Sequence, residues 1–295
     1  MAANEDGKTC HRAARRPRSR DAARGRSTTA AVLPVFLVLG LLGGCVNPVG
    51  RSLYKPTPLG SITPIWTERA PTLVETVTHD GVRLRGWYWP PATTDGAVLI
   101  YLPGRGGNRD TAALAAQAFA RDGHGLLVAS YRGYGDNAGV PDERGLYEDG
   151  RAFVARARQL VPNGRRFVFG DGLGSAVALH VAGEAPVAVD AVVTLGAFDS
   201  FARFVPGLAR GFYADAFDNV AAIRRVTVPV LLLHGRKDEV VPFAAAERLR
   251  AAAGGKALVV PIDGEAYHSF DLSHIAPVVW RALDQIAADE AAVAK

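Results

Sequence analysis

The chain of 295 residues contains only two cysteines, and neither lies in the stretch that alternates between strand-like and helix-like patterns. Cys10 falls in a basic N-terminal stretch, and Cys45 directly follows an apolar run. A domain without a pair of thiols is not a disulfide scaffold, even in an oxidising compartment.

The main part of the chain also lacks a charge imbalance. The formal net charge is +5, but residues 1–44 alone hold eight basic and three acidic residues, which leaves 26 of each in the remainder. A neutral domain gives no electrostatic reason to bind nucleic acid, so we expect no such partner.

Metal-ligand spacings and phosphate-binding loops are absent from the sequence as well. The glycine-rich loop at residues 104–107 lacks the lysine that a P-loop requires. We therefore expect no metal and no cofactor.

The apolar run at residues 30–42 is too short to span a bilayer, which takes about 20 apolar residues. It follows the basic stretch and leads to small residues, a pattern typical of a secretory signal peptide over residues 1–44. The segment Leu42-Gly43-Gly44-Cys45 resembles the bacterial lipoprotein box, which implies that Cys45 is lipidated and anchors the chain to a membrane. An uncleaved anchor with an incidental cysteine is the alternative.

The residues after Cys45 suggest where the anchor lies and how the domain is attached. By resemblance to lipoprotein sorting, Val46 favours the outer membrane of a Gram-negative cell envelope, with the domain facing the periplasm. Prolines recur up to position 64, so we expect residues 45–68 to form a Pro-rich tether of about 3 Å per residue.

Beyond the tether, residues 69–295 alternate between strand-like and helix-like patterns. Alternating residues at 73–78 and 82–89 flank a turn sequence and predict an antiparallel hairpin. Continuous apolar runs typical of buried parallel strands then alternate with helical stretches. This order predicts an α/β fold with a mostly parallel central sheet flanked by helices. The expected strands are 97–102, 125–130, 167–170, 191–195, 229–234 and 257–261, and the expected helices are 110–121, 146–160, 173–183, 243–253 and 275–288.

One sizeable insertion interrupts the alternation, at about residues 199–224. It is aromatic and helical in character, with Phe201, Phe204, Phe212, Tyr213 and Phe217. Two interpretations are open: a small cap that lines a pocket, and an ordinary surface helix.

Residues 165–176 predict a strand, a tight turn and a helix start, the context of the G-x-S-x-G nucleophile elbow. Here the sequence is Gly170-x-Gly172-x-Gly174, so the nucleophile position has no side chain. Ser175 lies about one turn along the helix, where a small residue packs against the sheet, and rescue by its hydroxyl is a minor alternative. We expect the side chain of Asp171 to face away from the site.

Five motifs occur in an order that identifies a family. The chain resembles the α/β-hydrolase superfamily, close to its serine-aminopeptidase-like (S33) and BEM46-like members, over roughly residues 70–290. The motifs are Gly104-x-Gly106-Gly107-Asn108, Tyr131-Arg132-Gly133-Tyr134-Gly135, Gly170-x-Gly172-x-Gly174, His234-Gly235-x-x-Asp238-x-x-Val241-Pro242, and His268.

The resemblance implies a role for each matching residue. Asp238 would orient His268, and His268 would act as general base. Backbone N–H groups of Arg105 and Leu173 would form the oxyanion hole. Gly104, Gly106 and Tyr134 would bind the substrate.

Alternatives stay open at several of these positions. Asp238 can instead cap its loop, His268 can be a surface histidine, and the Arg105 side chain can bind a substrate anion or point to solvent. The sequence also departs from the family pattern: Pro103 stands in place of the usual histidine, and Gly172 in place of the serine.

Without a serine hydroxyl the chain cannot form an acyl-enzyme. The resemblance therefore implies a tethered descendant of a serine ester or amide hydrolase with weak or non-standard activity, in which His268 activates water. A second hypothesis is a pseudo-hydrolase that binds an envelope ligand or partner, and a third is a purely structural lipoprotein. The expected ligand is a small ester- or amide-like molecule.

Overall fold

A single sheet of eight strands organises the part of the chain that the computed structural model describes, which is residues 53–184, 189–203, 215–263 and 271–293. Across the sheet the strand order is β10-β9-β8-β7-β4-β6-β3-β2. The strands are β2 (Thr72–Val77), β3 (Arg83–Trp89), β4 (Val98–Leu102), β6 (Gly125–Val128), β7 (Arg166–Asp171), β8 (Ala191–Leu195), β9 (Val230–Gly235) and β10 (Ala257–Ile262).

The pairing of these strands confirms the predicted mixture of parallel and antiparallel neighbours. The hairpin strands β2 and β3 pair antiparallel, and β3 pairs antiparallel with β6. Every other neighbouring pair in the sheet is parallel. Because the carboxyl ends of parallel strands meet at one edge, the loops after β4, β7 and β9 gather there.

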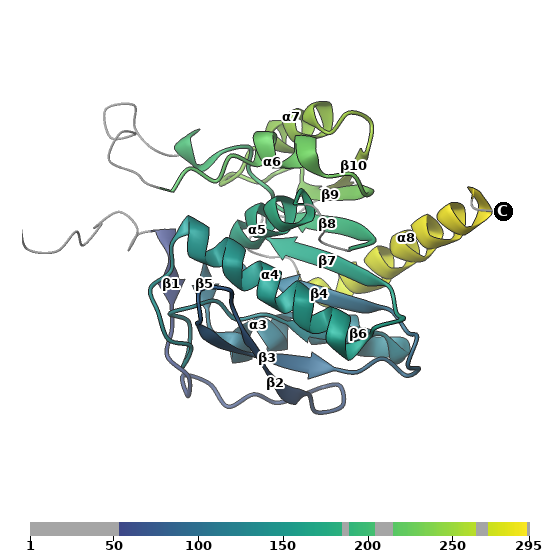
Figure 1. The fold of residues 1–295 in the computed structure, drawn as a ribbon. Coiled ribbons are helices and arrows are strands. Elements are labelled where there is room, and N and C mark those ends of the chain that lie inside the picture. Colours follow the sequence, from purple (N-terminus) through teal and green to yellow (C-terminus); the bar gives the residue numbers. More distant parts are fainter. Residues whose placement is uncertain (1–52, 185–188, 204–214, 264–270, 294–295) are drawn as a thin grey trace, which may run out of the picture. The chain divides into compact units, whose positions relative to one another are not determined.

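Helices cover both faces of the sheet (Figure 1). Val98, Ile100 and Leu102 of β4 belong to one buried cluster, and Leu99 and Tyr101 belong to the other, as the twofold period of a strand requires. The first cluster packs against α4 (Glu143–Leu160), α5 (Leu173–Ala182), α6 (Asn219–Arg225) and α7 (Ala244–Ala252). The second packs against α3 (Arg109–Ala116), the 3₁₀ helix η1 (Gln117–Gly123) and α8 (Leu272–Val293).

The segment before β2 differs from the sequence expectation. Residues 53–68 were expected to belong to a tether, yet Leu53 and Tyr54 are buried, and the Tyr54 hydroxyl donates to Asp215 at 2.8 Å. The Trp66 ring packs edge-on against Trp89, with 5.6 Å between the ring centroids. The expected boundary at residue 68 is therefore too late, because large apolar side chains hold this segment on the domain.

Two residues of the same segment form a strand. This strand, β1 (Lys55–Pro56), pairs in parallel with β5 (Gly106–Gly107), separately from the main sheet. The Lys55 N–H donates to the Arg105 carbonyl at 2.8 Å, and the Thr57 N–H donates to the Gly107 carbonyl at 2.9 Å. The N-terminal segment thus runs along the glycine loop that follows β4.

The described parts of the 199–224 insertion support both interpretations, since one part packs in the core and another lines a pocket. Phe217 is fully buried in the core, and α6 packs against α5 and α7. Phe201, in the 3₁₀ turn η2 (Phe201–Arg203), lines a pocket. Phe204, Phe212 and Tyr213 lie outside the described residues.

The described ranges contain neither a candidate membrane-spanning helix nor a metal-binding cluster. No helix there is both long enough and apolar enough to cross a bilayer. The same residues bring together no group of three metal-ligating side chains.

Candidate active site

The turn between β7 and α5 has the geometry of a nucleophile elbow. Gly172 is its single residue, with φ 51° and ψ −107°, a conformation that residues with a side chain rarely adopt. Its N–H donates to the Leu195 carbonyl of β8 at 2.9 Å, which ties the turn to the sheet. The elbow is therefore formed at a position without a side chain.

The two flanking glycines are required by close approach of the backbone. A Cβ on Gly174 would lie 2.0 Å from the Leu102 carbonyl oxygen. A Cβ on Gly170 would lie 2.5 Å from atoms of the following helix turn, including the Cα of Ser175. Since neither distance is possible for real atoms, the tight packing of β7, α5 and β4 accounts for both glycines.

Ser175 does not replace the missing hydroxyl. Its side chain is fully buried, and its Oγ donates to the Gly170 carbonyl at 2.8 Å, with the Leu195 carbonyl at 3.3 Å. The hydroxyl therefore faces the sheet, and the sequence expectation that this residue packs against the sheet is confirmed.

Two tyrosine hydroxyls fix the glycine loop that follows β4. The Tyr131 hydroxyl donates to the Pro103 carbonyl at 3.1 Å, and the Tyr134 hydroxyl donates to the Arg105 carbonyl at 2.7 Å. The peptide groups on both sides of the Arg105 N–H are thereby fixed. Asn108 ends the loop and caps α3, since its side chain accepts hydrogen bonds from the Asp110 and Thr111 N–H groups.

The two N–H groups predicted to bind an oxyanion belong to residues at one pocket. Leu173 is the first residue of α5, where a backbone N–H has no partner within the helix. Neither its N–H nor that of Arg105 donates a hydrogen bond within the described part of the chain. Both residues line the pocket, so both N–H groups are available to a ligand there.

Tyr134 corrects one prediction. The sequence suggested that it contacts substrate, but its ring is buried and the residue is not part of the pocket lining. The reason is that the Tyr134 hydroxyl donates to the Arg105 carbonyl, so this side chain supports the glycine loop.

Asp238 follows β9 and holds a buried carboxylate. Its Oδ1 accepts from the Val240 and Val241 N–H groups at 2.9 and 2.8 Å. Its Oδ2 is buried and has no hydrogen-bond partner in the described residues. His234 does not fill that role, because its Nε2 lies 2.7 Å from the Val241 carbonyl and 3.6 Å from Asp238.

A buried carboxylate oxygen without a donor is unfavourable, and an imidazole N–H would satisfy it. His268, the donor expected from the sequence, lies outside the described residues. The pairing of Asp238 with His268 stays a prediction.

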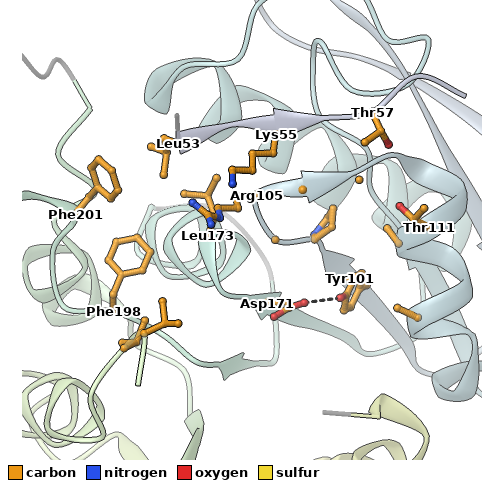
Figure 2. A pocket seen from close by; sticks show the side chains of 18 of the residues that line it. Leu53, Lys55, Thr57, Tyr101, Arg105, Thr111, Asp171, Leu173, Phe198 and Phe201 are labelled. Carbon is orange, nitrogen blue, oxygen red and sulfur yellow. Dashed lines mark hydrogen bonds between the residues drawn. The ribbon is translucent and has the colours of Figure 1, made fainter. Parts of the chain in front are cut away.

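Asp171 was expected to face away from the site, and this was wrong. Its side chain lines the pocket, and its Oδ2 accepts from the Tyr101 hydroxyl at 2.9 Å (Figure 2). The strand period contained the signal: Asp171 has the same parity along β7 as Phe167 and Phe169, which face the same side of the sheet as Tyr101.

The pocket has a volume of about 790 Å³ and two chemically different walls. Gly104 and Gly106 line it, and their contact with a substrate stays a prediction. Its apolar side chains are Leu53, Pro103, Ala112, Ala115, Leu173, Phe198, Phe201, Val240 and Val241. Its charged and hydroxyl-bearing side chains are Lys55, Thr57, Ser61, Tyr101, Arg105, Thr111 and Asp171.

Comparison with known proteins gives consistent results. Residues 97–225 match the family described as alpha/beta hydrolase fold. An uncharacterised protein of Mycobacterium tuberculosis is 32% identical over 255 residues, covering 81% of this chain and 89% of that protein. The lysophosphatidylserine lipase ABHD12 of Danio rerio is 27% identical over 190 residues, covering 55% of this chain and 49% of that protein.

Among solved structures, an esterase of Pyrococcus furiosus superposes with a TM-score of 0.62 at 18% identity, covering 80% of this chain and 98% of that one. The strand order, the elbow turn and the sequence matches lead to the same assignment. The chain belongs to the α/β-hydrolase family.

Proposed function

We propose that this protein is a slow, serine-independent ester or amide hydrolase, tethered to the cell envelope through a lipid on Cys45. The observation that carries the proposal is the elbow at Gly172, which lacks only its side chain. The Leu173 N–H follows Gly172 directly in sequence, and Leu173 and Arg105 line the same pocket. The proposed ancestry is a serine hydrolase of the S33-like or BEM46-like type whose serine became Gly172.

The proposed reaction uses water in place of the serine hydroxyl. The His268 imidazole takes a proton from water while the water oxygen attacks the substrate carbonyl carbon. The oxyanion accepts hydrogen bonds from the Arg105 and Leu173 N–H groups. Collapse of this intermediate breaks the bond to the leaving group, which takes the proton back from the imidazolium and leaves a free acid. No covalent enzyme intermediate forms.

The expected rate is modest. General-base catalysis contributes about 10²–10⁴-fold, and a triad enzyme without its nucleophile keeps about 10³–10⁴-fold over water. Asp238 supports the base, because its unpaired Oδ2 would orient the imidazole and stabilise its charged form. The lipase and esterase names of the relatives favour a carboxylic ester as the substrate.

A second candidate function is binding without turnover. It is favoured by Ser175, whose buried hydroxyl is committed to the Gly170 carbonyl and leaves no substitute nucleophile at the elbow. In that case the pocket holds an acyl ligand, and the oxyanion N–H groups bind its carbonyl or carboxylate.

Hydrolysis of p-nitrophenyl butyrate by residues 46–295 separates the two functions. The native chain is compared with His268→Ala, Asp238→Asn and Gly172→Ser. Turnover by the native chain that is lost in His268→Ala supports serine-independent hydrolysis. A silent native chain beside an active Gly172→Ser variant supports the binding function and contradicts the hydrolase.

A further inference from the structure

Two basic residues that line the pocket come from neighbouring backbone segments. Lys55 comes from β1 and Arg105 from the loop before β5, and their backbones are joined by the hydrogen bond from the Lys55 N–H to the Arg105 carbonyl. Both residues are exposed and both line the pocket. Figure 2 labels both side chains, with Leu173, among those that line the pocket.

Within the described residues, neither cation is paired with a carboxylate. Other arginines, such as Arg132, Arg151 and Arg248, lie within hydrogen-bonding distance of carboxylates. None of the ion pairs found within 4 Å among the described residues involves Lys55 or Arg105. Two adjacent like charges repel each other, so an anion placed between them relieves repulsion and gains attraction.

The Asp171 carboxylate also lines the pocket, but it forms no ion pair with Lys55 or Arg105. Asp171 accepts from the Tyr101 hydroxyl, and Figure 2 shows it directed towards that tyrosine rather than towards Lys55. Residues 45–295 carry equal numbers of basic and acidic residues, so the pair is not part of a generally basic chain.

The aromatic side chains of the pocket indicate that the rest of the ligand is apolar. Phe198 and Phe201 line the pocket and lie apart from the two cations in Figure 2. The Arg105 N–H belongs to the same residue as one of the two cations, so a carbonyl bound there would be close to the charged group. A ligand that fits has an anionic end, an adjacent carbonyl or phosphoryl oxygen and an apolar chain.

We infer that Lys55 and Arg105 bind the phosphate head of an acyl amphiphile, whose apolar chain lies against Phe198 and Phe201. A phosphate is preferred because it presents enough oxygens for a guanidinium fork and an ammonium group together. This inference rests on the proposed function and names its ligand class. Its test uses a ligand that cannot be hydrolysed, so the outcome is independent of the hydrolysis assay.

The test measures the affinity for decyl phosphate by calorimetry, with the full chain in neutral phosphatidylcholine nanodiscs. We expect Lys55→Gln/Arg105→Gln to weaken binding about 10- to 100-fold, an effect that shrinks in high salt because screening weakens the attraction. The affinity for 1-decanol should not change. Arg105→Lys keeps the charge and should keep most of the affinity.

The matched control is Arg144→Gln/Lys256→Gln, which removes two exposed positive charges away from the pocket lining. Its affinity for decyl phosphate should equal that of the native chain. Equal losses for decyl phosphate and 1-decanol, or equal losses in the control, would overturn the inference. Inorganic phosphate binding as tightly as decyl phosphate would overturn the amphiphile and leave free phosphate as the ligand.

Discussion

At the scale of single residues, the site depends on a backbone conformation. Gly172 holds φ 51° and ψ −107° at almost no cost, whereas a residue with a side chain would be strained by about 1–3 kcal/mol. A glycine at this position therefore leaves the elbow without a hydroxyl and without backbone strain at the same time.

This argument predicts that Gly172→Ser and Gly172→Ala both lower the free energy of unfolding by about 1–3 kcal/mol. Urea denaturation followed by circular dichroism measures the change. The two variants should be equally destabilised, because the strain comes from the Cβ that they share. A variant as stable as the native chain would show that the turn relaxes around the new side chain.

Asp80 gives a pH prediction at the same scale. The Arg132 guanidinium donates to both oxygens of Asp80 at 2.7 and 3.0 Å, and this holds the pKa of that carboxyl well below its ordinary value. A folded-state pKa below the unfolded one stabilises the fold above about pH 4, and the contribution is lost as the pH falls towards the folded-state value.

The urea midpoint should therefore fall between pH 5 and pH 2.5 by more in the native chain than in Asp80→Asn. The isosteric amide has no carboxylate to titrate, so it isolates this group from the other acids. Identical pH profiles for the two proteins would show that Asp80 contributes nothing to acid sensitivity.

At the scale of elements, one side chain links the N-terminal segment to α3. The Asn108 Oδ1 caps α3, while its Nδ2 donates to the Pro58 carbonyl at 2.9 Å and reaches the hydroxyls of Thr57 and Ser61. The asparagine thus serves a helix with one atom and the N-terminal segment with another.

Asn108→Asp should keep the cap and lose the hydrogen bonds to the N-terminal segment, whereas Asn108→Ala should lose both. We expect hydrogen exchange at residues 55–57 to quicken in both variants. Protection of the first turn of α3 should fall only in Asn108→Ala, at a cost of about 1 kcal/mol. Equal protection of residues 55–57 in all three proteins would mean that β1 is held by its own pairing alone.

The elements themselves were largely predictable from the sequence, because periodicity and flanking glycines describe a buried parallel strand well. The apolar run at 97–102 became β4, and Asn108 became the predicted cap. The packing of residues 53–68 was not predictable, since their prolines are typical of a spacer and their contacts are distant in sequence. Asp171 was missed because the elbow motif was considered without the parity of β7.

At the scale of the whole molecule, the family and the sheet topology agree, whereas attachment to a membrane remains a prediction from the N-terminal sequence. If Cys45 carries a lipid, Cys45→Ser should move the protein from the membrane fraction to the supernatant. Incorporation of radiolabelled palmitate should disappear with it. A Cys45→Ser chain that stays in the membrane fraction would favour the uncleaved anchor.

The pairing of β1 with β5 has a mechanical consequence. Tension applied to the N-terminal side of the chain reaches Leu53, Tyr54 and the two hydrogen bonds around Lys55 before it reaches any strand of the main sheet. A two-residue pair yields at lower force than the eight-stranded sheet, so the glycine loop would loosen while the fold stayed intact. The candidate site is therefore the part of the domain that responds first to a pull from its N-terminal side.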